Sequence, residues 1–219
     1  MITLTTILSE SAAAQLLIAN WASSEDLAQA ALHQNNLRRH NFLLARASLK
    51  ALLTDVTGIS NWNIHPDSNG KPHAFTTKDI AYPHISISHT RGLVACAVSQ
   101  DSPIGIDVEY WRTRDFRALA AYAFGMRERE EVAHKGISAF YRIWTVREAI
   151  AKISGIGILA MLDGMDYASD SPASGCWTTG ERQIFYSSPH TDYSLAVASP
   201  CSEDRTEVKP KFVDVTAVV

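Results

Sequence analysis

Residues 84–110, H-I-S-I-S-H-T-R-G-L-V-A-C-A-V-S-Q-D-S-P-I-G-I-D-V-E-Y, decide the fold class of this chain. Residues 84–88 alternate between polar and apolar side chains, and residues 93–98 form a compact apolar run after an Arg-Gly turn. This pattern is typical of a β-hairpin. A third strand is expected over 104–110, because it follows a turn containing Asp101, Ser102 and Pro103. The stretch therefore predicts a small, largely antiparallel sheet.

Helical patterns lie on both sides of these strands. Residues 23–57 predict a long helix with a break near Gln34-Asn35-Asn36, since Ser23 or Ser24 can cap its start and Gly58 follows its end. Residues 117–135 favour another helix. Residues 138–153 form the clearest amphipathic pattern, which stops before Gly155.

Each half of the chain thus combines a long helix with a strand pair, the second pair being expected over 183–186 and 193–198. We predict an α+β fold of two pseudo-symmetric lobes, each a small sheet packed with a long helix. The expected N-terminal lobe covers residues 1–102 and the C-terminal lobe residues 103–200. Residues 201–219 form a tail that the pattern does not assign.

The composition is ordinary and carries no global charge bias. The 219 residues have a formal net charge of −3, and 46% of them are hydrophobic. This balance gives no reason to expect nucleic acid or an anionic membrane as a partner. The first residues lack the basic start of a signal peptide, and no run approaches the about 18 apolar residues of a membrane span. Three widely spaced cysteines suggest neither a zinc site nor disulfides, so a cytoplasmic protein is expected.

Two carboxylates stand out on the expected strand 104–110. Residues at positions i and i+2 of a strand point to the same face, so Asp107 and Glu109 lie side by side. Clustered carboxylates repel unless a cation or solvent screens them, and hard oxygen ligands suit Mg²⁺. An exposed strand face is the simpler interpretation of the pair when it is taken alone.

A second carboxylate and an ammonium group share one face of the expected helix 138–153. Glu148 and Lys152 are separated by four residues, the spacing of neighbours on a helix surface. They are compatible with a surface salt bridge or with two groups that converge on a phosphorylated ligand. The residue before the glutamate is Arg147, whose fork-shaped guanidinium differs from lysine in how it meets a phosphate.

Four further residues could contact phosphate oxygens. Ser88 and His89 end a strand near a turn, and Lys71 lies beside a Gly-Pro turn. Arg46 falls within the otherwise apolar stretch F-L-L-A-R-A-S-L. Each of them is equally compatible with an exposed or structural role when taken alone.

In order along the chain, these segments resemble the 4′-phosphopantetheinyl transferases of the Sfp type, the surfactin-synthetase-activating family. The resemblance covers about Arg39 to Gly157. Its motifs are R-x-x-F-L-x-x-R-A, N-G-K-P, I-S-I-S-H, I-G-I-D-V-E, and W-T-V-R-E-A-x-x-K followed by S-G-I-G-I. The last two motifs are the most specific.

The resemblance implies an enzyme that transfers 4′-phosphopantetheine from coenzyme A to a serine of an apo carrier protein, an acyl or peptidyl carrier, and releases 3′,5′-ADP. It implies a Mg²⁺ site formed by Asp107, Glu109 and Glu148. Glu148 would also be the base for the serine hydroxyl. Lys152 would bind phosphates and assist the leaving group. The residues implied to hold coenzyme A are Arg46, Lys71, Ser88, His89 and Lys152, with Arg39 a weaker correspondence.

Carriers of this kind are acidic, so we expect a basic docking surface, for which Arg112, Arg114 and Arg117 are the candidates. Both expected lobes lie in one chain, so a monomer is expected. Two other hypotheses stay open: a non-catalytic module that binds coenzyme A or a carrier, and a metal-dependent phosphohydrolase. The pattern does not identify the carrier or its pathway, nor whether Glu109 ligates the metal directly or through water.

Overall fold

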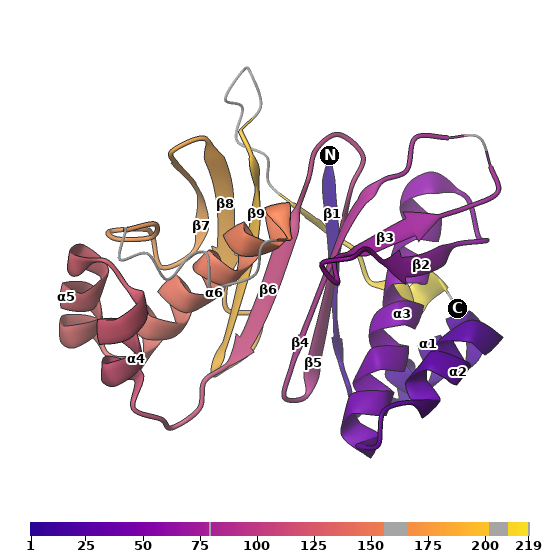
Figure 1. Ribbon diagram of the computed structural model, residues 1–219, viewed down its shortest axis with the longest axis horizontal. Coiled ribbons are helices and arrows are strands. Elements are labelled where there is room, and N and C mark those ends of the chain that lie inside the picture. The colour runs from indigo at the N-terminus through magenta and orange to yellow at the C-terminus, as the bar shows by residue number, and fades with distance from the viewer. Residues whose placement is uncertain (79, 156–165, 202–209, 219) are drawn as a thin grey trace. The chain divides into compact units, whose positions relative to one another are not determined.

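The computed structural model describes the chain except for residues 79, 156–165, 202–209 and 219 (Figure 1). The chain divides into two compact units. Residues 1–101 together with 210–219 form the first unit, and residues 102–209 form the second. The described part of the C-terminal segment therefore belongs with the N-terminal half of the chain.

The first unit combines a four-stranded sheet of order β10-β1-β5-β4 with three helices and the separate hairpin β2–β3. Strands β1 and β5 are antiparallel, as are β4 and β5, whereas β10 joins β1 in parallel. The elements are β1 (Ile2–Leu8), α1 (Ala12–Trp21), α2 (Ser24–Ala31), α3 (Asn36–Thr57), β2 (Asn63–Pro66), β3 (Pro72–Phe75), β4 (His84–Thr90), β5 (Leu93–Ser99), β10 (Lys211–Phe212) and η2 (Val215–Val218).

Capping explains where the helices of this unit begin and end. Ser23 and Asp26 form a reciprocal capping box at the start of α2. The Asn35 side chain accepts a hydrogen bond from the backbone of Arg38 and starts α3, so the expected 23–57 helix is broken where its Asn-rich segment lies. Gly58, at φ 72°, ends α3 in the left-handed conformation that glycine adopts most easily.

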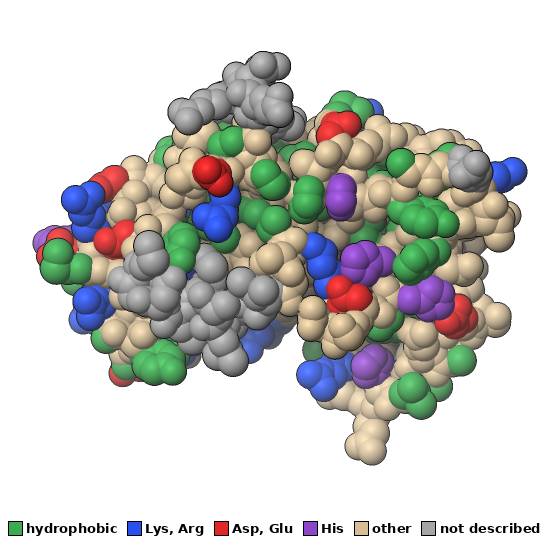
Figure 2. Space-filling model, turned by 45° about the horizontal axis from the view of Figure 1, so that its top comes forward, with side chains coloured by type: hydrophobic (Ala, Val, Ile, Leu, Met, Phe, Trp, Pro, Cys, Tyr) green, Lys and Arg blue, Asp and Glu red, His purple; other side chains and the backbone are tan. Residues whose placement is uncertain are grey.

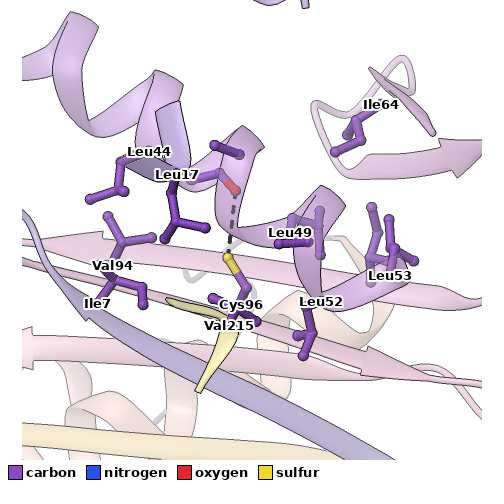
Figure 3. Packing of buried hydrophobic residues seen from close by; sticks show 14 of the residues in the cluster. Ile7, Leu17, Leu44, Leu49, Leu52, Leu53, Ile64, Val94, Cys96 and Val215 are labelled. Carbon is purple, nitrogen blue, oxygen red and sulfur yellow. Dashed lines mark hydrogen bonds between the residues drawn. The ribbon is translucent and has the colours of Figure 1, made fainter. Parts of the chain in front are cut away.

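The core of the first unit lies between α3 and the sheet (Figure 3). Leu49, Leu52 and Leu53 of α3 are fully buried there. The Cys96 thiol on β5 points to α3 and donates to the carbonyl of Ala45 at 3.6 Å. Val215, from η2, is also fully buried in this cluster, so a segment that the sequence pattern left unassigned completes the first core.

The second unit places one long helix against an antiparallel sheet of order β6-β9-β8-β7. Helix α6 packs on β9 and β6, and its aromatic and aliphatic residues form a separate core with residues of β8 and β9. The elements are β6 (Gly105–Tyr110), α4 (Phe116–Ala123), α5 (Met126–Lys135), α6 (Ile137–Ser154), β7 (Gly175–Thr179), β8 (Arg182–Ser187) and β9 (Tyr193–Pro200).

The two units have the same internal connectivity. In each, a first strand leads through helices into a long helix, and a hairpin then returns so that its last strand pairs antiparallel with the first strand. The α+β prediction, with a sheet and a long helix in each half, is therefore confirmed. In the described part of the chain, no helix is both long and apolar enough to cross a membrane.

Candidate active site

Strand β6 and helix α6 approach each other closely because Gly105 has no side chain. A Cβ atom at this position would overlap the carbonyl group of Ala149 on α6. The glycine in I-G-I-D-V-E therefore allows the strand that carries two acidic residues to lie directly against the helix that carries a third. Register with β9 is regular, and Asp107 lies opposite Ala196.

Asp107 and Lys152 form the closest charged contact of this group. The Lys152 ammonium donates to Asp107 Oδ1 at 2.8 Å and to the carbonyl of Ile106 at 3.0 Å. Asp107 is 5% exposed, whereas the Lys152 side chain retains some exposure. The lysine thus lies at the edge of the group, where it can meet a ligand as well as the carboxylate.

Glu109 and Glu148 both have raised pKa values, and the charge of Asp107 contributes to each. The pKa of Glu148 is raised to about 7, chiefly by burial and secondly by repulsion from the Asp107 charge. The charge of Lys152 lowers this pKa, but its effect is smaller. Burial and Asp107 likewise raise the pKa of Glu109 to about 7, and Glu148 adds to the effect. The charge of Asp107 therefore acts on two glutamates, one on its own strand and one on α6.

Two side chains that the sequence pattern did not connect with this group favour the ionised form of Glu109. The charge of Arg114 and a hydrogen bond from the Trp144 side chain both act against the rise in the Glu109 pKa. The Arg114 guanidinium lies over the rings of Tyr141 and Trp144, 5.0 and 5.6 Å from their centroids. The only sequence signal for Trp144 is its position one helical turn before Glu148.

Carboxylate oxygens suit a hard cation, but the described residues contain no group of three or more His, Cys, Asp or Glu side chains that could hold a metal ion. Mg²⁺ usually takes only one or two protein carboxylates and keeps waters and phosphate oxygens in its shell. Buried carboxylates that raise one another's pKa are stabilised when a cation joins them. The chemistry of Asp107, Glu109 and Glu148 is therefore compatible with Mg²⁺.

The other expected ligand contacts belong to the first unit. Ser88 is buried on β4 opposite Ala95, and His89 is exposed opposite Val94. Lys71 lies in the β2–β3 turn, where burial lowers the pKa of its ammonium despite the nearby Asp67 charge. Histidine side chains gather on one face of this unit (Figure 2). These residues and the three carboxylates lie in separate units.

Arg46, expected to contact coenzyme A, makes contacts that hold the first unit together. It is 7% exposed, donates from Nη1 to the carbonyl of Ile64 at 2.6 Å and lies over the Phe42 ring. Burial lowers its pKa, against the opposing charges of Asp26 and Glu25. Its position joins α3 to the hairpin β2–β3.

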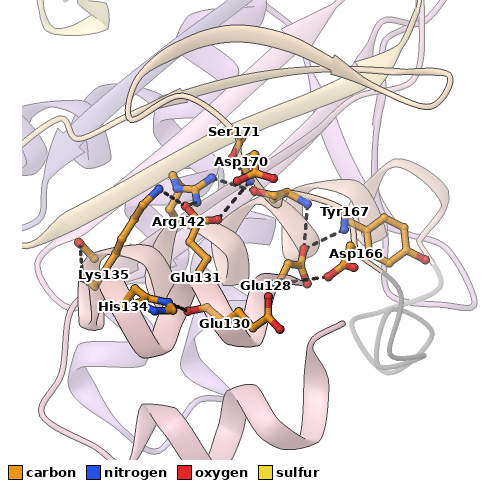
Figure 4. A network of polar contacts seen from close by, with 12 residues as sticks. Glu128, Glu130, Glu131, His134, Lys135, Arg142, Asp166, Tyr167, Asp170 and Ser171 are labelled. Atoms are coloured by element: carbon orange, nitrogen blue, oxygen red, sulfur yellow. Dashed lines mark hydrogen bonds and ion pairs between the residues drawn. The ribbon is translucent and has the colours of Figure 1, made fainter. Parts of the chain in front are cut away.

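Arg147 does not face Asp107 and Glu109, which corrects the expectation that it meets a phosphate. It is fully buried, and its Nε and Nη2 donate to Glu128 Oε2 at 3.1 and 2.7 Å. Glu128 Oε1 accepts the backbone N–H groups of Tyr167 and Ala168, each at 2.8 Å (Figure 4). Adjacent positions of α6 point to different sides, so Arg147 fastens α5 and residues 167–168 to α6 while Glu148 faces β6.

The expected docking arginines differ in environment. Arg112 and Arg117 are exposed, and Arg114 is half-buried against aromatic rings. Part of the S-G-I-G-I motif, residues 156–158, lies outside the described residues.

Lys152 is paired with Asp107, and the charge of Asp107 raises the pKa of both Glu109 and Glu148. A carboxylate whose pKa is about 7 can accept a proton near neutral pH. The ammonium can stabilise negative charge on a phosphate oxygen.

The segment that holds these residues is similar to a known protein family. Residues 103–198, which hold all of these groups, match the 4′-phosphopantetheinyl transferase superfamily. The chain is 33% identical over 156 residues to the 4′-phosphopantetheinyl transferase HetI of Nostoc sp., covering 67% of this chain and 64% of that protein. It is 29% identical to a 4′-phosphopantetheinyl transferase of Bacillus subtilis, covering 77% and 76% of the two chains.

Similarity extends to a putative 4′-phosphopantetheinyl transferase of Haemophilus influenzae, at 29% identity over 56% of each chain. The chain thus spans somewhat less than two thirds of the length of several relatives it matches.

Proposed function

We propose, from the match of residues 103–198 to the 4′-phosphopantetheinyl transferase superfamily, that this chain transfers 4′-phosphopantetheine from coenzyme A to a serine of an apo carrier protein. The products would be the holo carrier and 3′,5′-ADP. The observation that carries the proposal is the hydrogen-bonded ion pair between Lys152 of α6 and Asp107 of β6, beside which burial and the Asp107 charge raise the pKa of Glu109 and Glu148.

In this proposal Glu148 accepts the proton of the carrier's serine hydroxyl as its oxygen attacks the β-phosphate of coenzyme A. Its pKa of about 7 leaves a substantial ionised fraction at neutral pH. The bond from the phosphorus to the bridging oxygen breaks, and the charge develops on the leaving 3′,5′-ADP. Lys152, held beside Asp107, stabilises that charge.

Asp107, Glu109 and Glu148 are the proposed ligands of Mg²⁺. When bound, the ion would polarise the phosphate and offset its negative charge. Repulsion among the three carboxylates supports this assignment, since it is relieved by a cation.

Lys71, Ser88 and His89 are proposed to contact the nucleotide part of coenzyme A. Their side chains offer the donors that phosphate oxygens require. Arg46 would contribute through the hairpin that carries Lys71, because its guanidinium donates to the carbonyl of Ile64 on β2.

We also propose that the protein acts in the cytoplasm as a monomer, with one chain supplying both units. The exposed Arg112 and Arg117 are the better candidates for docking an acidic carrier, since exposed charges steer encounter.

The test is incubation of the protein with apo carrier proteins, coenzyme A and Mg²⁺, followed by intact-mass measurement of the carrier. We expect the gain of one phosphopantetheine, and loss of activity by at least about a hundredfold in Asp107→Ala and Glu148→Ala. Glu130→Ala, an exposed glutamate of α5, serves as the control with unchanged activity.

Hydrolysis of coenzyme A without carrier modification would instead indicate a phosphohydrolase. Binding of coenzyme A without any reaction on a panel of carriers would indicate a non-catalytic module.

A further inference from the structure

Residues 111–115 connect strand β6, which carries Asp107 and Glu109, to helix α4. Within this segment the Arg112 side chain is exposed, whereas Arg114 is half-buried and its charge acts on the Glu109 carboxylate. Two arginines separated by one residue therefore meet different surroundings, one of them solvent and the other a proposed metal ligand. The contacts that fix the backbone of this segment decide where each arginine lies.

Tyr141 of α6 contacts three residues of this segment. Its hydroxyl accepts a hydrogen bond from the backbone N–H of Arg112 at 2.7 Å and donates to the carbonyl of the same residue at 3.3 Å. Its ring stacks on Trp111, with centroids 6.2 Å apart and planes 8° from parallel. The Arg114 guanidinium lies over the same ring, 5.0 Å from its centroid. One side chain therefore holds residues 111, 112 and 114 against α6.

The Tyr141 hydroxyl takes the place of a neighbouring strand where the sheet ends. The pairing of β6 with β9 extends to Tyr110, and the N–H of Trp111 adds one bond to the carbonyl of Asp192 at 2.8 Å. In an antiparallel sheet, a residue can direct its N–H and its C=O to one residue of the next strand. Arg112 directs both groups to one hydroxyl instead. The backbone of Arg112 is thereby constrained, and with it the direction in which the side chain leaves.

Tyr141 and Trp111 are themselves held in place. Tyr141 is fully buried in the second core, where its ring meets the Phe140 ring edge to face at 5.2 Å. The indole Nε1 of Trp111 donates to Ser194 Oγ at 2.9 Å. Buried polar groups whose hydrogen bonds are satisfied favour a single arrangement. The backbone of Arg112 is therefore ordered before any partner arrives.

We infer that Tyr141 is a positioning residue that orients Arg112 for the docking of an acidic carrier protein. The inference rests on the proposed function, because Arg112 would meet the carrier of that reaction. As an exposed guanidinium, Arg112 can pair with a carboxylate of the carrier. Fixing its backbone before the encounter reduces the conformational entropy that is lost on binding.

The test measures the binding of an apo acyl carrier protein to the whole protein by calorimetry, without coenzyme A. Tyr141→Phe keeps the ring and removes the hydroxyl, so we expect an affinity about fivefold weaker, the effect of about one hydrogen bond. Arg112→Ala should weaken binding at least as much. The double variant should bind as Arg112→Ala does, because Tyr141 acts through Arg112.

Tyr186→Phe is the matched control, since it removes another buried hydroxyl of the same unit, one that is hydrogen-bonded to Ser194 Oγ at 2.8 Å. Both tyrosine variants should lower Tm by similar amounts, but only Tyr141→Phe should weaken carrier binding. At high salt, where exposed charges are screened, the difference in affinity between Tyr141→Phe and the unsubstituted protein should shrink. A merely structural role of Tyr141 would leave that difference independent of salt.

Three results would each overturn the inference: unchanged carrier affinity in Tyr141→Phe, equal weakening in Tyr186→Phe, or effects of Tyr141→Phe and Arg112→Ala that add in the double variant. Absence of carrier binding by the unsubstituted protein would overturn it as well. Phosphopantetheine transfer is measured separately by mass. Transfer with unchanged affinity in Tyr141→Phe would refute this inference alone, and binding without transfer would refute the proposed reaction alone.

Discussion

Glu109 and Glu148 hold protons more tightly in the folded protein than in the unfolded chain. Their pKa values of about 7 lie above the ordinary value of 4.5. Between these values the folded state binds more protons, so the free energy of unfolding should fall as pH rises from 4.5 to 7 and stay low above that range.

Glu109→Gln mimics the protonated carboxyl group and should flatten this dependence. In EDTA, we expect the variant to match the unsubstituted protein at pH 5 and to exceed its stability at pH 8 by about 1 kcal/mol, since partial exposure weakens the effect. Denaturant unfolding at several pH values measures the difference. Glu130→Gln should leave the dependence unchanged, and an identical slope in both variants would contradict the prediction.

Arg114 should matter for metal binding rather than for carrier docking. Removing its charge lets the Glu109 pKa rise further, which disfavours the ionised form that a cation requires. Arg114→Ala should therefore raise the Mg²⁺ concentration for half-maximal transfer about fivefold, with a smaller change in Arg114→Lys.

Arg117→Ala is the matched control, because Arg117 is an exposed arginine of α4. It should alter the KM for carrier and leave the Mg²⁺ dependence in place. The opposite pattern in the two variants would show that Arg114 is a docking residue.

The sequence could predict that Asp107 and Glu109 are neighbours and that Glu148 and Lys152 share a helical face, because strand and helix periods are local. It could not predict that Arg147 turns inward, since its partner Glu128 lies on another helix. Burial of Arg46 against the carbonyl of Ile64 likewise depends on tertiary packing. The periodicity of a sequence therefore cannot predict a residue's role when that role depends on a partner far along the chain.

At the level of elements, the contact between β6 and α6 depends on Gly105. Gly105→Ala should destabilise the protein by about 2 kcal/mol or more, because the new methyl group meets the Ala149 carbonyl. Transfer activity should fall with it, since the strand must shift relative to Glu148. Thermal unfolding and the kcat of the soluble fraction measure the two effects.

Gly58→Ala provides the comparison, because Gly58 has a positive φ but open space around its Cβ position. It should cost about 1 kcal/mol and leave kcat unchanged. A smaller loss of stability in Gly105→Ala than in Gly58→Ala would contradict the close-approach argument.

The amphipathic and alternating segments predicted the long helices and the central hairpin. The expected helix 117–135 divides into α4 and α5 at Phe124-Gly125, where the chain becomes extended. The short strands β2 and β3 were missed because three prolines and a glycine interrupt residues 60–83, and their pairing depends on tertiary contacts. Strand β1 was missed for a similar reason, since its apolar residues are interrupted by threonines that are themselves buried.

At the level of the whole molecule, residues 210–218 make the first unit dependent on the far end of the described chain. Val215→Ala should lower the free energy of unfolding by about 2 kcal/mol, since its side chain is fully buried. Hydrogen exchange should accelerate in β1 and α3 and stay unchanged in α6, which belongs to a separate core. Thr216→Ala, at a half-buried neighbouring position, is the control; faster exchange in α6 alone would contradict the assignment.

The pairing of β10 with β1 also has a consequence during synthesis on the ribosome. Strand β1 leaves the exit tunnel before residues 102–209, and its parallel partner β10 emerges only after them. The second unit, whose sequence is continuous, can complete its core while the first still lacks Val215. Of the two units, the one whose translation begins earlier is thus the one that completes its core later.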